Sequence, residues 1–275
     1  MGAVSRAAVL RAMAGALAAA RIERSQIRRT IGTGYGRKLV PGADRTFTEI
    51  TCHARGAAAL RPGVKLVVDI GGQDSKAIAV DGDGLVDRFA MNDRCASGTG
   101  RFYDVLARAL EVDIADIGPL ALAGSTELEI SSMCATFAET EVISLLAQGQ
   151  DTADIAASVH RAVAARTLGL VAQVGKATPT VMTGGVAKNP AARQFLSAAL
   201  GYEIETLEQP QIAGAYGAGL LALDDYLGAV PTSMREDTPI VAADPGPPRC
   251  AECAAGVAHS AHRVPVMIPL GGETR

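Results

Sequence analysis

Short apolar runs bounded by glycine alternate with helical stripes along most of the chain. Residues 65–70 form a β-branched, apolar run that is typical of a buried strand. Two glycines then lead into residues 75–80, and a Gly-Asp-Gly turn leads into residues 85–91. This spacing predicts three consecutive antiparallel strands. Residues 179–183 predict a further strand, which runs into Gly184-Gly185.

Apolar residues with a helical period predict helices around these strands. The expected helices cover residues 48–60, 102–110, 138–146 and 155–170, the stretch after Asn189-Pro190, and about residues 214–227. From Gly228 onward prolines are frequent and the periodicity is weak. Residues 229–275 are therefore interpreted as an irregular, Pro-rich tail.

The first segment, residues 7–20, resembles a signal peptide that ends in three alanines. However, Arg11 interrupts the apolar run, and Leu10, Met13, Ala14 and Leu17 share one helical face. This spacing favours an amphipathic helix that packs on a domain, and hence a cytoplasmic protein. An α/β domain seldom opens with a bare helix and no preceding strand.

Composition narrows the class of protein. The 275 residues suffice for one large domain or two ordinary ones, and 48% are hydrophobic. No apolar run approaches the roughly 20 residues of a membrane span. The net charge of −3 and the 4% of aromatic residues do not favour a nucleic-acid partner. Five cysteines, an odd number, indicate reduced thiols rather than a disulfide scaffold.

Three glycine turns have the chemistry of a nucleotide site. Asp69 ends a strand just before Gly71-Gly72, where backbone N–H groups can approach phosphate and a carboxylate can hold Mg²⁺ or orient water. Gly184-Gly185 permits flat contact with a base or ribose, and residues 98–100 stand at a predicted helix N-terminus. Each could be only a tight turn, but together they favour a nucleotide cleft. Neither the P-loop nor the Rossmann motif is present.

Two cysteines, Cys95 and Cys134, each stand just before a predicted helix. A helix N-terminus stabilises a thiolate and would equally stabilise an anionic metal–sulfur cluster. Two thiolates cannot complete an iron–sulfur cube, but a two-fold homodimer would supply four. The alternative is two buried or inert thiols, which the lack of a C-x-x-C spacing favours.

The same motifs together resemble one family: the 2-hydroxyacyl-CoA dehydratase activators and the ATP-binding subunits of benzoyl-CoA reductase, of the BadF/BadG/BcrA/BcrD type. The matching segments are residues 32–37, 68–76, 92–100, 131–141 and 181–189, and the similarity extends from about Ser5 to Leu227. The resemblance implies an α/β, actin-like fold of duplicated ribonuclease H-like domains. It implies that residues 1–62, completed by about 211–228, are the remnant of a first domain, and that residues 63–210 are the second.

The resemblance also implies a function. Cys95 and Cys134 of both chains of a homodimer would hold one [4Fe-4S] cluster, which reduced ferredoxin or flavodoxin loads. Binding and hydrolysis of ATP with Mg²⁺ would then reorient the helices that follow the two cysteines. One low-potential electron would pass to an acyl-CoA dehydratase or reductase component. A sister subunit in a heteromeric reductase is an alternative to the second identical chain.

The family motifs assign site residues by position. Asp69 and Gln73 are expected to be catalytic. The expected nucleotide contacts are Gly71, Gly72, Asp74, Gly98, Thr99, Gly100, Gly184, Gly185, Lys188, Gln211 and Gly214. The family's first phosphate loop, of the type D-x-G-S-T-x-x-K, has no match ahead of Ser5. This departure predicts weak ATP binding and poor hydrolysis.

Other interpretations stay open. A small-molecule kinase of the same superfamily would use Asp69 as a base, and an ATPase-impaired paralogue would keep only the dimer and the cluster. In the tail, Cys250, Cys253, His259 and His262 have ligand types that suit zinc, although a disordered tail is the simpler interpretation.

Overall fold

The computed structural model describes residues 5–92, 96–130 and 135–230. The chain divides into a unit of residues 1–243 and a segment of residues 244–275, and that segment lies wholly outside the described residues. The predicted Pro-rich tail therefore stays a prediction. All the described residues belong to the first unit.

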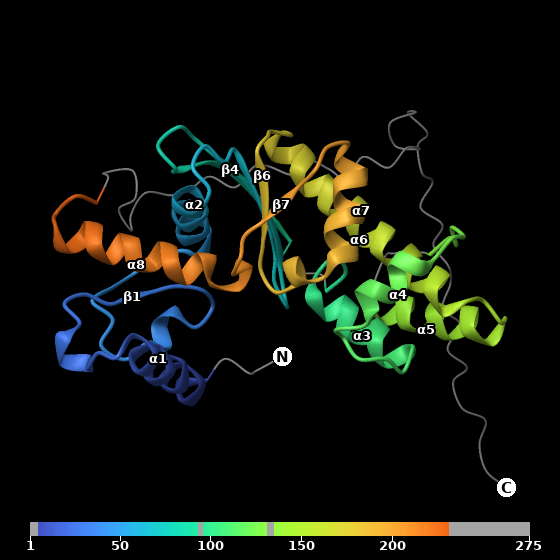
Figure 1. Cartoon of the computed structure of the whole chain (residues 1–275), viewed down its shortest axis with the longest axis horizontal. Coiled ribbons are helices and arrows are strands. Elements are labelled where there is room, and N and C mark those ends of the chain that lie inside the picture. The colour runs from blue at the N-terminus through green and yellow to red at the C-terminus, as the bar shows by residue number, and fades with distance from the viewer. Residues whose placement is uncertain (1–4, 93–95, 131–134, 231–275) are drawn as a thin grey trace, which may run out of the picture. The chain divides into compact units, whose positions relative to one another are not determined.

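A five-stranded mixed sheet forms the centre of the unit (Figure 1). Strands β3 (Leu66–Ile70), β4 (Ser75–Val80) and β5 (Val86–Asn92) are consecutive and antiparallel, which confirms the prediction. Strand β6 (Thr180–Thr183) pairs in parallel with the other edge of β3, and the short β7 (Glu205–Thr206) follows it. The carboxyl ends of β3 and β6 therefore lie side by side, which brings the turns after them together.

Both faces of this sheet are buried, because successive apolar residues of its central strands pack into two cores on opposite faces. On β3, Leu66 and Val68 belong to the larger core, whereas Val67 belongs to the smaller core on the opposite face. On β4, Ala77 and Ile78 divide in the same way. Successive side chains of a strand point to opposite faces, so continuous apolar runs need cover on both sides.

Helices provide that cover. Helix α2 packs its apolar residues into the smaller core, and α3, α6 and α7 pack into the larger one. The helices are α2 (Glu49–Leu60), α3 (Gly100–Ala109), α4 (Ile117–Ala123), α5 (Ala135–Ala147), α6 (Thr152–Val174), α7 (Pro190–Leu200) and α8 (Ala213–Tyr226). The structure adds elements that the pattern did not predict, among them α4 and β7.

Helices α2 and α8 lie against each other, beside the two-stranded sheet of β1 (Ile31–Gly32) and β2 (Arg45–Thr46) (Figure 1). Glycines permit the close approach of the two helices. A Cβ atom on Gly56 would collide with the carbonyl oxygen of Ala213, and one on Gly217 would collide with that of Cys52. Cys52 is thereby buried.

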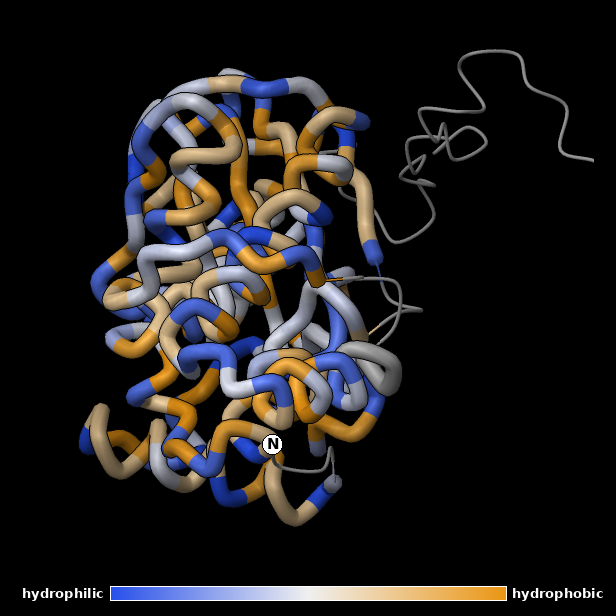
Figure 2. The backbone as a smooth tube through the Cα atoms, turned by 90° about the vertical axis from the view of Figure 1, so that its right-hand side faces the viewer, coloured by the Kyte–Doolittle hydropathy of each residue, from blue (hydrophilic) through white to orange (hydrophobic). Residues whose placement is uncertain are grey.

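The first helix, α1 (Arg6–Ala20), confirms the predicted element, and its predicted apolar face is only partly covered: Met13 and Leu17 are half-buried, whereas Leu10 and Ala14 are exposed. No residue of α1 is buried, and Leu10 is 48% exposed. Apart from Arg6 and Arg11 this helix consists of apolar residues and one glycine, so alanine occupies all its sides and the stripe through Met13 and Leu17 is narrow. Figure 2 shows hydrophobic and hydrophilic positions interspersed along the backbone of the described residues as a whole. Within the described ranges, no helix is long and apolar enough to cross a membrane.

Candidate nucleotide site

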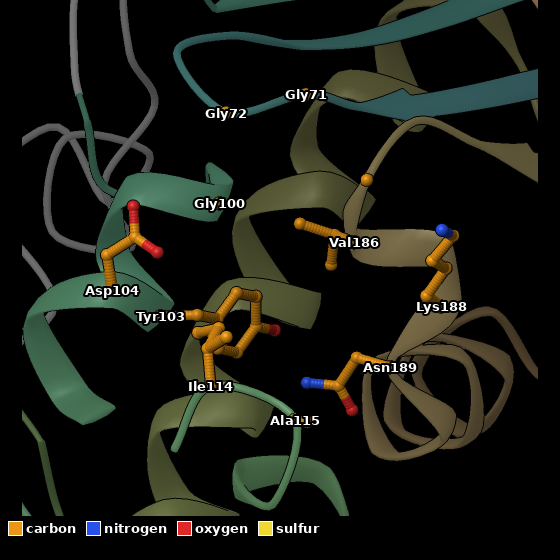
Figure 3. Close-up of a pocket in the computed structure, with 11 residues that line it drawn as sticks. Gly71, Gly72, Gly100, Tyr103, Asp104, Ile114, Ala115, Val186, Lys188 and Asn189 are labelled. Carbon is orange, nitrogen blue, oxygen red and sulfur yellow. The ribbon is translucent and has the colours of Figure 1, made fainter. Parts of the chain in front are cut away.

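The glycine turns converge on one pocket of about 390 Å³ (Figure 3). Its lining residues come from the β3–β4 turn, the start of α3, the stretch before α4 and the turn after β6: Gly71, Gly72, Gly100, Tyr103, Asp104, Ile114, Ala115, Gly185, Val186, Lys188 and Asn189. Pockets for drug-sized ligands span about 300–1,000 Å³, so this one is large enough for a small organic molecule. Five of the predicted contact residues are among its lining.

The β3–β4 turn is fixed to the start of α3 by two backbone hydrogen bonds. Gly100 N–H donates to the carbonyl of Gly71 at 2.8 Å, and Arg101 N–H donates to the carbonyl of Gly72 at 3.0 Å. These bonds satisfy two of the N–H groups that a helix leaves open at its first turn. Within the described part of the chain, the N–H groups of Gly72 and Gln73 have no partner, so they are available to an anion.

The turn after β6 supplies the facing wall. Gly184 has φ +86°, and a Cβ atom there would collide with the carbonyl oxygen of Ile70. Only glycine permits this conformation together with such close packing on the end of β3. The chain then enters the short 3₁₀ helix of Val186–Lys188. In Figure 3 the Lys188 amine points toward the end of the pocket where Gly71 and Gly72 lie.

A buried charged network lies at the carboxyl ends of the same strands. Lys76 is 1% exposed, and its Nζ lies 2.7 Å from Asp74 Oδ2, 3.3 Å from Asp69 Oδ2 and 3.3 Å from Glu49 Oε1. Asp69 Oδ1 accepts a hydrogen bond of 2.8 Å from Thr183 Oγ1. We call the group Glu49, Asp69, Asp74 and Lys76 the Lys76 network. It joins α2 to strands β3 and β4.

Burial and charge compete in this network. Burial opposes ionisation of Asp69, but His53 and the Lys76 ammonium outweigh it and hold the pKa of the carboxyl below its ordinary value. Burial likewise opposes the charge of Lys76, and Asp69 and Glu49 overcome it, so the pKa of Lys76 is raised. Burial raises the pKa of Glu49 despite the neighbouring ammonium. Asp69 and Lys76 are therefore a stable ion pair at neutral pH.

The remaining predicted residues surround the pocket. Thr99 is buried and donates through Oγ1 to the carbonyl of Ala96 at 2.7 Å. A Cβ atom on Gly185 would lie 3.4 Å from Gln211 Nε2, and one on Gly214 would lie 2.7 Å from His53 Nε2. The predicted catalytic roles of Asp69 and Gln73 stay predictions, and so do all the predicted nucleotide contacts, including those of the five residues that line the pocket.

Sequence reasoning missed several residues of the site. Tyr103 and Asn189 line the pocket, and His53 contributes Nδ1 at 3.5 Å from Asp69 Oδ1. Tyr103 stands in an apolar helical stripe, where an aromatic residue is normally interpreted as core. Asn189 precedes a proline and caps α7, so its sequence signal is that of a helix start. Ile114 and Ala115 belong to no recognisable sequence motif, so no signal could have identified them.

Both predicted cluster cysteines, Cys95 and Cys134, lie outside the described residues. The helices that follow them are described: α3 begins at Gly100, and α5 begins at Ala135, directly after Cys134. These two helices pack against each other. Cys250, Cys253, His259 and His262 also lie outside the described residues. Among the residues that are described, no group of three or more His, Cys, Asp or Glu side chains could hold a metal ion.

Comparison with known proteins identifies the class. The family model of the BadF/BadG/BcrA/BcrD ATPase family matches residues 3–222. The chain therefore belongs to this family of ATPases, as its motifs predict.

Two individual relatives agree with this family assignment. The chain is 46% identical over 213 residues to the (R)-2-hydroxyglutaryl-CoA dehydratase activating ATPase of Acidaminococcus fermentans, covering 77% of this chain and 82% of that protein. It is 41% identical over 214 residues to the activator of lactoyl-CoA dehydratase of Anaerotignum propionicum, covering 78% of this chain and 83% of that protein.

A solved structure confirms the fold. The activator of the 2-hydroxyisocaproyl-CoA dehydratase from Clostridium difficile, determined with bound ADPNP, superposes with a TM-score of 0.76 at 39% identity. The superposition covers 80% of this chain and 82% of that one. The α/β fold is thus the actin-like fold that the resemblance implies.

Proposed function

We propose that this chain is an ATP-dependent activator that passes a low-potential electron to an acyl-CoA dehydratase or reductase component. The pocket on which the predicted glycine turns converge is the observation that carries the proposal. Relatives of the chain include activators of 2-hydroxyacyl-CoA dehydratases and a subunit of benzoyl-CoA reductase. The proposed class of partner enzyme is taken from these names.

ATP is proposed to place its phosphates at the glycine end of the pocket. Gly72, whose N–H group has no partner among the described residues, lies on one wall, and Gly185 and the exposed Lys188 lie on the other. Glycine turns of this kind bind phosphate because their N–H groups can approach the oxygens closely. Mg²⁺ is proposed to arrive with the triphosphate, since Asp69 and Asp74 are already engaged by Lys76.

The iron–sulfur cluster is proposed to be held by Cys95 and Cys134 of two copies of the chain. The described surroundings fit this assignment, because each cysteine precedes one of two helices that pack together. Four thiolates would suit a [4Fe-4S] cluster, which supplies one-electron redox chemistry when bound. The chain's own contribution would be to hold together the two helices that follow the cysteines.

A hydrogen-bonded link connects the two proposed sites. Gly71 and Gly72 line the pocket, and their carbonyls accept from the first N–H groups of α3, the helix that follows Cys95. A phosphate that shifts the glycine turn must therefore also shift, or break, the start of α3. This is how nucleotide binding would reach the cluster residues.

Anaerobic reconstitution with iron and sulfide tests the proposal. We expect broad absorbance near ~400 nm and about four irons per dimer in the wild type. Cys95→Ser and Cys134→Ser should each lose this absorbance. Cys52→Ser is the matched control and should keep it, because Cys52 is buried in α2 and burial raises the pKa of its thiol to about 11.

Two results would contradict the proposal. Full iron content in both Cys95→Ser and Cys134→Ser would remove the cluster assignment. An iron-loaded wild type that fails to activate a dehydratase in the presence of ATP and a reduced ferredoxin would remove the activator role. Phosphoryl transfer to a small-molecule hydroxyl by an iron-free chain would favour the kinase alternative.

A further inference from the structure

A short stretch near the start of the chain carries a charge opposite to that of the rest. Residues 21–42 contain six basic residues and one acidic residue, which gives this stretch a net charge of +5. The whole chain carries −3, so the residues outside the stretch together carry −8. A charge asymmetry of this size along a chain is typical of an interaction surface for an anionic partner.

Hydrogen bonds order this stretch without neutralising its charge. Arg24 Nη2 donates to the carbonyl of Pro41 at 3.1 Å. This bond joins the short 3₁₀ helix of Arg24–Gln26 to the loop that follows a second 3₁₀ helix, Arg37–Leu39. Glu23, the acidic residue of the stretch, belongs to the capping box of the first helix. Within the described residues, the guanidinium of Arg24 bonds only to neutral carbonyls, so its positive charge is kept.

Four basic side chains are exposed on the two sides of this junction. Together with two exposed apolar residues we call them the basic surface: Arg21, Arg24, Arg28, Lys38, Ile22 and Leu39. Among the residues that the structure describes, Arg21, Arg28 and Lys38 have no ion-pair partner. The neighbouring Arg29, by contrast, pairs with Asp44. The basic surface therefore presents positive charge that the described part of the chain does not neutralise.

The basic surface belongs to neither of the two proposed sites. In Figure 1 the blue part of the chain, which contains α1 and β1, lies beside α8 and apart from α3 and α5. Residues 21–42 contribute no side chain to the lining of the pocket. A second protein can therefore contact this surface without blocking the pocket.

We propose that the basic surface docks on an acidic face of the acyl-CoA component that this chain activates, an inference that rests on the proposed function. The guanidinium groups pair with carboxylates of the partner, and Ile22 and Leu39 contact an apolar part of the same face. The charge of −8 on the rest of the chain repels an acidic protein, so the basic surface also orients the encounter.

The side chains favour a protein over other polyanions. Three of the four basic residues are arginines, which form paired hydrogen bonds to carboxylates and are enriched in protein interfaces, where lysine is depleted. Ile22 and Leu39 are 37% and 40% exposed, and they add apolar contact area that a phosphate backbone does not use. A membrane surface favours a long helix with one apolar and one polar face, whereas both 3₁₀ helices here have three residues.

Charge reversal tests the docking. The full chain, loaded with iron and sulfide, is titrated into the (R)-2-hydroxyglutaryl-CoA dehydratase whose activator is 46% identical to it, with ATP and reduced ferredoxin. The double variant Arg21→Glu/Arg28→Glu should raise the half-saturating concentration of the chain about tenfold, because it removes the attraction that guides the encounter. The maximal rate of activation and the iron content should stay unchanged.

A matched control separates the basic surface from net charge. Arg88→Glu/Arg193→Glu makes the same change in net charge at two exposed arginines on β5 and α7, each in an exposed ion pair. Exposed pairs contribute little to stability, so this variant should fold normally. It should change the half-saturating concentration by less than about twofold, because neither arginine belongs to the docking face.

Salt and the apolar side chains provide a second readout. Salt screens exposed charges, so it should raise the half-saturating concentration of the wild type more than that of Arg21→Glu/Arg28→Glu. Ile22→Ser/Leu39→Ser should also raise this concentration but keep the salt dependence of the wild type. Leu60→Ser/Leu122→Ser is the control, since these two leucines are similarly exposed on α2 and α4.

The outcomes separate this inference from the proposed function. A wild type that activates the dehydratase no better than Arg21→Glu/Arg28→Glu overturns the inference alone, as does an equal loss in the matched control. Tighter binding to phosphatidylserine vesicles or to a DNA duplex than to the dehydratase, lost on charge reversal, overturns the choice of a protein partner. An iron-loaded wild type that does not activate the dehydratase removes the activator role, and the inference with it.

Discussion

Two buried polar clusters lie near the same pocket, and they are built on opposite principles. The Lys76 network consists of charged groups, each of which meets an opposite charge within the protein. The cluster of Tyr103, His160 and Asn189 is uncharged, and it leaves one hydroxyl and one amide N–H without a partner among the described residues. The first cluster is thus complete in itself, whereas the second leaves two hydrogen-bonding groups open.

This difference shows how residues near one pocket can stabilise the fold in one cluster and leave hydrogen-bonding groups open in another. Buried charges are tolerated only when they are paired, and the Lys76 network holds α2 on the ends of β3 and β4 through such pairs. Removal of any one of its members should therefore lower the free energy of unfolding strongly. A buried hydroxyl without a partner costs less, and a ligand can supply the missing bond. Substitutions in the two clusters should therefore differ in their effect on stability.

The largest loss of stability is expected from Lys76→Met. This change leaves Asp69 and Asp74 buried without their counter-charge, and loss of one partner of a buried pair costs about 3–5 kcal/mol. Denaturant unfolding measures the change in free energy. Arg61→Met, which removes a pair between two exposed side chains, Arg61 and Glu205, is the control and should leave the midpoint unchanged. Equal midpoints for Lys76→Met and the wild type would refute the structural role of the network.

The second effect concerns pH. Burial lowers the pKa of His160 from 6.5 to about 4, so the unfolded chain takes up a proton at higher pH than the folded chain does. The contribution of a neutral His160 is full above pH 6.5 and is lost as the pH falls toward 4, by about 2–3 kcal/mol.

The pH effect is measured as the wild type minus His160→Gln, in the free energy of unfolding across this range. Asp69 does not interfere, because its pKa is lowered and its contribution is lost only at still lower pH. Parallel pH profiles for the two proteins would contradict a buried, neutral His160.

A smaller effect is expected from Thr183→Val. The change removes the hydrogen bond to Asp69 Oδ1 but keeps the shape of the buried side chain. Hydrogen bonds to charged groups contribute about 1.5–3 kcal/mol, so the unfolding free energy should fall by about 2 kcal/mol. Thr183→Ser retains the hydroxyl and should lose less. Equal losses in both variants would show that the methyl group, not the bond, is what matters.

The smallest effect is expected from Tyr103→Phe in the absence of nucleotide. Its hydroxyl makes no hydrogen bond within the described residues, so its removal should leave the unfolding free energy unchanged or raise it by up to about 1 kcal/mol. Thermal unfolding with and without ATP measures both states. A stability loss comparable to that of Thr183→Val, without ligand, would show that Tyr103 is satisfied within the protein.

The sheet and most helices can be predicted from the sequence because local patterns define them. The glycine turns after β3 and between β4 and β5 specify antiparallel pairing, and Asn189-Pro190 marks the start of α7. Short elements such as α4 lack an apolar stripe long enough to stand out. The predicted face of α1 is covered only in part, because helical spacing identifies an apolar face but not how much of it another element covers.

Site residues can be predicted from the sequence where they belong to a recognisable motif, and they are missed where they do not. Gly71, Gly72 and Gly185 carry a turn signature, so the glycines that line one end of the pocket can be found from the sequence. Tyr103 and His160 lie on separate helices, and nothing in the local sequence relates them. Their meeting at Asn189 depends on how α3, α6 and α7 pack, which only the tertiary structure reveals.

A crystal structure of the chain with Mg²⁺ and ADPNP is the most direct test of nucleotide binding in this pocket. We expect the phosphates against the N–H groups of Gly72 and Gly185, and the base between Tyr103 and Asn189. A nucleotide bound elsewhere on the chain, or one whose base points away from Tyr103, would contradict this assignment.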